Sequence, residues 1–118
     1  MRHALLIVAL TVPMALLACT ASGPASTSAT KSNVSFKTDV APMMKASCVA
    51  CHAPGGEGAG DGVFFTAAGD VDYAAVKASA GRISRQVASG GMPRAGAKWT
   101  ADQVATFQGW QAAGAQNN

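Results

Sequence analysis

A chain of 118 residues has room for one folded domain of ordinary size. Nine Lys and Arg side chains against six Asp and Glu give a net charge of +3, too weak a basic field to indicate nucleic-acid binding. The three cysteines and two histidines exclude any site that needs many thiol or imidazole groups.

The first residues have the form of an export signal. A basic start at Arg2 precedes a run of about 15 uncharged residues from Ala4 to Ala18, and Cys19 follows. The run is shorter than the roughly 20 residues that a membrane-spanning helix needs, and Pro13 interrupts it. We therefore expect residues 1–18 to be a signal peptide. An uncleaved anchor helix is the alternative.

The residues before Cys19 indicate the kind of signal. "LLAC", Leu16 to Cys19, resembles the lipobox of bacterial lipoproteins, which implies cleavage before Cys19 and lipid attachment to its sulfur. Two or more acyl chains hold a protein firmly on a bilayer, so the resemblance implies a periplasmic protein tethered to a membrane. Thr20 in place of an aspartate implies the outer membrane rather than the inner. Ordinary secretory cleavage, leaving a free thiol, is the alternative.

The next segment changes composition. Residues 19–34 are rich in Ser, Thr, Ala, Gly and Pro, which cannot bury enough apolar surface to fold. We expect a lipid-anchored flexible linker with a reach of about 20 Å. A folded domain is expected at residues 35–114, with a disordered tail at 115–118. A domain of roughly 80 residues often needs a metal, a disulfide or another staple to supplement its core.

The first expected helices lie in the first half of this domain. Residues 36–46 predict one helix or a pair of short helices, with Pro42 either kinking the helix or starting its second part. Asp70 or Asp72 is placed to cap a short helix around Tyr73.

Two further helices are expected toward the C-terminus. Ile83 and Val87, four apart, indicate a helix that ends at glycine. Thr100 and Gln103 form a capping box before a run of apolar positions, and Gly114 is the expected stop. No stretch alternates like a strand, so the prediction is an all-α domain of about four short helices.

"CVACH" places Cys48 and Cys51 three apart, with His52 directly behind. A structural zinc site needs four ligands, and beyond the signal peptide and the Cys19 expected to carry lipid, these three are the only cysteine and histidine side chains. A thioredoxin-like dithiol belongs to alternating strands and helices, which this chain lacks. A structural disulfide in a turn leaves His52 without a role.

The fourth interpretation of this motif is covalent haem, for which C-x-x-C-H is the attachment signature. The two thiols add to vinyl groups on one side of the porphyrin, so they must lie about one helical turn apart, as i and i+3 do. His52 is then carried under the ring, where its imidazole can bind iron. Here the chain resembles small single-haem c-type cytochromes over residues 35–114.

That resemblance implies a cytochrome c-like fold wrapped around one covalently attached haem c. It also implies that the first and last helices cross beside the haem, with Phe36 facing Phe107 or Trp110.

Met92 is the candidate for the second axial ligand. It lies far enough beyond His52 for the chain to wrap the porphyrin, Gly90 and Gly91 permit a close backbone approach, and Pro93 stiffens the loop. A methionine in an exposed turn is the alternative.

Two other methionines, Met43 and Met44, lie too close to the attachment segment to reach the opposite face. They are expected in the core.

Several side chains near Met92 in sequence are candidates for pairing with the haem propionates, with solvated charge as the alternative for the charged ones. These candidates are Arg82, Arg85, Lys98 and Trp99.

This ligand inventory favours a carrier of single electrons over an enzyme. We expect the protein to be a monomer. Its unidentified redox partners would be a dehydrogenase, a reductase or a terminal oxidase. The alternative is a haem enzyme or gas sensor, with Arg94 acting after Met92 detaches. A third alternative is a structural lipoprotein in which the motif binds nothing.

Overall fold

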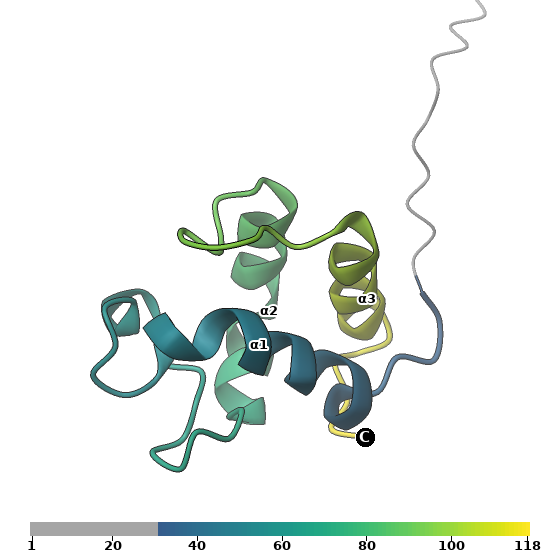
Figure 1. The fold of residues 1–118 in the computed structure, drawn as a ribbon. Helices are drawn as coiled ribbons and strands as arrows, with labels where there is room; N and C mark the ends of the chain where they lie inside the picture. The colour runs from purple at the N-terminus through teal and green to yellow at the C-terminus, as the bar shows by residue number, and fades with distance from the viewer. Residues whose placement is uncertain (1–30) are drawn as a thin grey trace, which may run out of the picture.

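The computed structural model describes residues 31–118, and this part of the chain is helical (Figure 1). Its elements are, in chain order, the π-helix η1 (Phe36–Val40), α1 (Ala41–His52), the 3-10 helix η2 (Ala59–Asp61), α2 (Tyr73–Ala88) and α3 (Ala101–Ala112). Over residues 31–118 there is no strand, only an isolated bridge between Phe65 and Val71. The expected all-α class is confirmed for these residues, with three α-helices where about four helices were expected.

The first helical segment is longer than expected. Ser35 caps η1 by accepting a hydrogen bond from the Thr38 N–H at 3.3 Å, and η1 continues directly into α1. Pro42 lies in the first turn of α1, where the missing N–H costs nothing, so it starts the second part of the segment. The segment then runs past the expected end at Ala46 and carries the cysteine motif on its last turns, to His52.

The two helices expected around Tyr73 and Ile83 are a single helix, α2. Asp72 caps it, because its carboxylate accepts the N–H of Ala75 at 3.1 Å. Gly81 lies inside the helix at a cost of about 1 kcal/mol relative to alanine. A continuous buried stripe outweighs that cost; its apolar members are Val76, Ala80, Ile83 and Val87.

The capping box predicted for the last helix is present. The Gln103 N–H donates to the Thr100 hydroxyl at 3.2 Å, and the Thr100 N–H donates to the Gln103 side-chain oxygen at 2.8 Å. The helix ends at Ala112, and Gly114 adopts a positive φ of 93° just beyond it. Local sequence signals therefore fix both ends of α3.

The core lies where η1, α2 and α3 meet. The Phe36 ring centroid is 5.4 Å from that of Trp110 and 5.0 Å from that of Tyr73. Trp110 and Phe107 are themselves fully buried and lie 5.3 Å apart. The expected contact between Phe36 and the last helix is therefore confirmed at Trp110.

The folded unit differs from the expected boundaries at both ends. Val34, expected in the linker, is buried, and Gly109 on α3 leaves room for the chain to pass at Lys31. Asn118, expected in a disordered tail, accepts the N–H of Lys37 at 3.0 Å through its carbonyl oxygen. The N-terminal end is held by the buried side chain of Val34, and the C-terminal end is held by the hydrogen bond from the first helical segment to Asn118.

The predicted signal peptide, Cys19 and residues 20–30 of the predicted linker lie outside the described residues. Among residues 31–118, no helix combines the length and apolar character that crossing a membrane would require.

Candidate cofactor site between α1 and the Met92 segment

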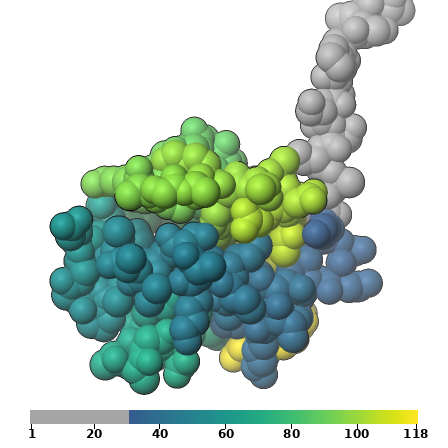
Figure 2. Space-filling model, in the orientation of Figure 1, coloured from purple at the N-terminus to yellow at the C-terminus, as the bar shows by residue number. Residues whose placement is uncertain are grey.

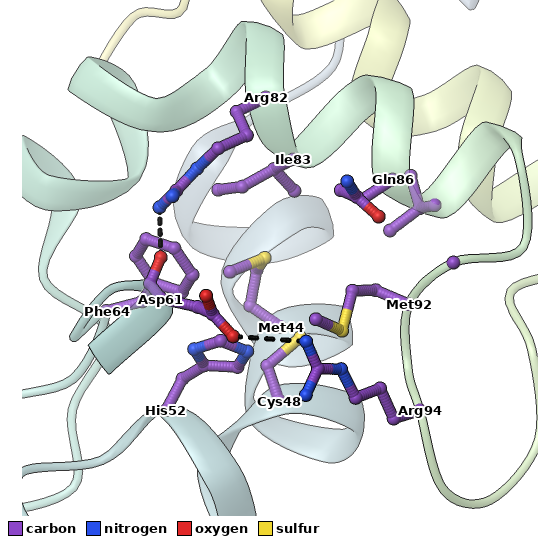
Figure 3. A pocket seen from close by; sticks show the side chains of 12 residues that line it. Met44, Cys48, His52, Asp61, Phe64, Arg82, Ile83, Gln86, Met92 and Arg94 are labelled. Atoms are coloured by element: carbon purple, nitrogen blue, oxygen red, sulfur yellow. Dashed lines mark hydrogen bonds and ion pairs between the residues drawn. The ribbon is translucent and has the colours of Figure 1, made fainter. Parts of the chain in front are cut away.

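A cavity of about 220 Å³ lies between the last turns of α1, α2 and residues 91–98, which we call the Met92 segment (Figure 3). In Figure 2 this segment, in yellow-green, lies over the blue and teal residues of α1 and its following loop. Cys48, His52 and Met92 all line the cavity. Three of the predicted site residues are thus brought together, from elements far apart in sequence.

Cys48 and Cys51 lie one turn apart on α1, and both are half-buried free thiols. Cys48 faces the cavity, whereas Cys51 is not among the lining residues. Burial of Cys48, with a smaller contribution from the neighbouring Cys51, raises the pKa of the Cys48 thiol to about 11. A reactive dithiol needs a lowered thiol pKa, so this environment does not favour the thioredoxin-like interpretation.

The imidazole of His52 is buried and held in one orientation. Its Nδ1 lies 2.7 Å from the carbonyl oxygen of Gly62, and its ring packs against Phe64 with centroids 5.0 Å apart. A carbonyl can only accept, so in the neutral imidazole Nδ1 carries the proton and Nε2 keeps a free lone pair. A histidine fixed in this way is prepared to bind a metal through Nε2.

The loop after α1 approaches this ring closely. A Cβ on residue 58 would lie 3.2 Å from His52 Nε2 and 3.1 Å from Cε1, so a side chain at Gly58 would crowd the imidazole. The Gly58 N–H also donates to the Cys51 carbonyl at 2.8 Å, which fixes the loop against the end of α1. Glycine at position 58 therefore allows the loop to pack closely against the His52 ring.

Met92 is half-buried and packs against the hydrophobic core. Its N–H donates to the carbonyl of Gln86 at 3.1 Å, which holds it at the end of α2. Gly90, at φ 73°, makes the turn that brings the chain back toward α1. The glycine expected before the candidate ligand is therefore required by backbone conformation.

The two other methionines lie in or against the core, as expected, but they are not equivalent. Met44 is fully buried and forms part of the cavity wall, whereas Met43 packs against the core elsewhere. The spacing in the sequence accounts for this difference. Met44 lies four residues before Cys48, so the two side chains share one face of the helix.

Charged groups stand at the mouth of the cavity. The guanidinium of Arg94 lies 3.3 Å from the Asp61 carboxylate, and the Arg82 guanidinium donates to the Asp61 backbone carbonyl. All three residues line the cavity. The sequence predicts a role for Arg94 only in the enzyme alternative, and it gives no signal that places Asp61 at the cavity.

Of the four candidates for the propionates, only Arg82 lines the cavity. Arg85, Lys98 and Trp99 are not among its lining residues. Lys98 donates to the Pro93 carbonyl, and Trp99 is buried against Phe107 with centroids 5.8 Å apart.

In the described part of the chain, no three His, Cys, Asp or Glu side chains lie close enough together to hold a metal ion among themselves. Comparison of the chain with protein-family models, with curated proteins and with solved structures found no significant match.

Proposed function

We propose that residues 31–118 form a c-type cytochrome domain that carries single electrons with one haem c. Cys48 and Cys51 would hold the haem covalently, and His52 and Met92 would bind its iron. The observation that carries the proposal is that His52 and Met92, separated by 40 positions in sequence, line one cavity together with Cys48.

The donor set suits this group. A ferrous or ferric porphyrin iron takes an imidazole nitrogen and a thioether sulfur as axial ligands, and His52 offers a free Nε2 because Nδ1 is committed to Gly62. The helical spacing of Cys48 and Cys51 matches two thioether bonds on one side of the ring. The apolar wall contributed by Met44 and Ile83 suits the porphyrin plane.

Haem supplies a reversible one-electron couple, and a His and Met ligand pair raises its reduction potential. The chain's own contribution is to hold the ligands still and to exclude water. His52 is fixed by Gly62 and Phe64, and Met92 is fixed by its backbone bond to Gln86. With both ligand positions taken by side chains, no place remains for a substrate on the metal, which favours a carrier.

The competing proposal is a haem enzyme or gas sensor in which Met92 leaves. Arg94 lines the cavity two residues after Met92, where it could act on a bound ligand. The Arg94 guanidinium is paired with Asp61, however, so this function requires that both the Met92–iron bond and the Asp61–Arg94 ion pair break.

We further propose that Cys19 anchors the domain by lipid in the periplasm, on the outer membrane rather than the inner. A monomer in this position would exchange electrons with a dehydrogenase, a reductase or a terminal oxidase. This part of the proposal rests on the N-terminal sequence pattern alone.

Expression of the full chain in a bacterium with haem-attachment machinery tests the proposal. We expect haem that stays on the polypeptide after denaturation and gives a c-type pyridine haemochrome spectrum. The Cys48→Ser, Cys51→Ser double variant should lose it, whereas Cys19→Ser should retain it as the matched cysteine control. A wild-type chain without covalent haem would contradict the proposed function.

A further inference from the structure

Asp61 is held from two sides at the mouth of the cavity (Figure 3). Its carboxylate pairs with Arg94 at 3.3 Å, and its backbone carbonyl accepts a hydrogen bond from Arg82 on α2. The Arg94 and Asp61 side chains are 75% and 55% exposed, so solvent reaches the pair. We call this contact the Asp61–Arg94 bridge.

The position of the bridge in the chain connects it to both candidate iron ligands. Asp61 directly precedes Gly62, whose carbonyl accepts the Nδ1–H of His52. Arg94 lies two residues after Met92. The bridge therefore joins the loop that orients one ligand to the segment that carries the other.

Few other polar contacts hold the Met92 segment. Within the described part of the chain, the Lys98 amine bonds to Pro93 inside the same segment, and residues 94–98 are exposed. Over residues 93–98 of this described part, the pair with Asp61 is the only hydrogen bond or ion pair to another part of the molecule. The segment is otherwise fixed at its two ends, by the Met92 N–H and by buried Trp99.

We propose that Asp61 and Arg94 are positioning residues: their bridge holds the Met92 segment closed across the cavity and so keeps the Met92 thioether on the iron. This inference rests on the proposed function. An exposed ion pair contributes little free energy, so its loss should shift the displacement of Met92 by about two- to fivefold rather than abolish binding.

Titration of the ferric full-length protein with imidazole measures that displacement, through loss of the near-infrared sulfur-to-iron charge-transfer band. Asp61→Asn and Arg94→Gln should each raise the apparent imidazole affinity about two- to fivefold. The Asn variant keeps the backbone carbonyl that Arg82 uses and a side-chain oxygen that can accept from Arg94, so it removes only the charge of the bridge. The double variant should match either single variant, because both remove the same ion pair.

A charge-reversal double variant distinguishes a direct ion pair from two separate electrostatic effects of Asp61 and Arg94 on the iron site. Asp61→Arg combined with Arg94→Asp should bring the imidazole affinity back toward the wild-type value. Asp70→Asn is the matched control, since it removes the similarly exposed Lys45–Asp70 pair, 3.7 Å apart and away from the cavity. The proposal would be overturned if the two single substitutions had additive effects on the imidazole affinity, or if the charge reversal did not restore that affinity. It would also be overturned if Asp70→Asn changed the affinity as much as Asp61→Asn.

Hydrogen exchange of the Met92 amide, which is protected by its bond to the Gln86 carbonyl, gives a readout that needs no iron. Faster exchange in both single variants, reversed in the charge swap, supports the bridge, and unchanged exchange overturns it. A protein without the c-type spectrum would overturn the proposed function itself and, with it, the role assigned to the bridge at Met92. The two failures are therefore distinguishable.

Discussion

At the scale of single residues, the candidate site depends on groups that fix His52 rather than on His52 alone. Gly62 supplies the acceptor for Nδ1, Phe64 packs on the ring, and Gly58 leaves space beside Nε2. Two of these three contacts come from glycines in the loop that follows α1. The consequence is that a loop substitution can disturb the proposed iron ligand without touching it covalently.

Met92→Ala tests the second ligand. We expect loss of the near-infrared band, binding of carbon monoxide by the reduced protein, and a lower reduction potential, because a thioether stabilises ferrous iron relative to water or hydroxide. The haem should stay attached through Cys48 and Cys51. Met43→Leu is the matched control, since Met43 packs outside the cavity. A wild-type protein that lacks the band and binds carbon monoxide readily would favour the enzyme or sensor.

Gly58→Ala tests the space beside the imidazole. The added methyl would lie 3.2 Å from Nε2, so either the loop or the ring must shift, at a cost of about 1–3 kcal/mol in the free energy of unfolding. Gly60→Ala is the control, because a Cβ there meets nothing within 4 Å. Urea denaturation gives the stability, and the absorption spectrum reports the ligation of iron. Equal behaviour of the two variants would mean that the loop gives way freely.

At the scale of helices, the sequence patterns whose predictions the structure confirms are local ones. The capping box at Thr100 and the cap at Asp72 each involve residues three apart, and the structure has both. The split of α2 into two helices was wrong because Gly81 interrupts the local pattern, while burial along the whole helix holds it together. Packing against another element is not readable from a window of a few residues.

The same limit applies to the candidate site. Cys48 and His52 could be predicted because one short motif contains them, and Met92 because its flanking glycines and proline mark a turn. Asp61 and Arg94 could not be paired from sequence, because their contact depends on how two loops meet across the cavity. Met44 could be assigned to the core but not to the cavity wall, since that requires the position of α2.

Two glycine substitutions in helices should have opposite effects on stability. Gly109→Ala on α3 would bring a methyl into the backbone of Lys31, and we expect a loss of about 1–3 kcal/mol. Gly81→Ala on α2 meets side-chain atoms only at 3.6 and 3.7 Å, so the gain in helix propensity should stabilise by up to about 1 kcal/mol. Urea midpoints of the two variants check this. Equal urea midpoints for the two variants would contradict the close packing of the Lys31 backbone against Gly109.

At the scale of the whole molecule, the two ends of the described chain meet. Ser35 donates its hydroxyl to the Asn118 carbonyl at 2.8 Å, and the Phe36 N–H donates to the Asn118 side chain at 2.9 Å. The helical segment that starts there ends at His52. The chain thus enters the fold beside the start of this segment, whereas Cys48 and His52, which line the cavity, lie on its last turns.

Cys19→Ser tests the anchor that the sequence predicts. We expect the variant to appear in the periplasmic fraction with its haem content and spectrum unchanged, because residue 19 precedes the folded unit. Fractionation followed by absorption spectroscopy makes the comparison with wild type. A variant that remains with the membrane would exclude lipid attachment at Cys19 as the anchor.

The helical segment from Phe36 to His52 also sets how far the proposed haem site would lie from the proposed anchor at Cys19. Its 5 and 12 residues extend over about 25 Å at 1.5 Å per residue. If residues 19–30 form the coil that their composition predicts, that coil adds about 20 Å. Under the proposed anchoring at Cys19 the two lengths add, so we expect the cavity to stay within about 45 Å of its attachment point.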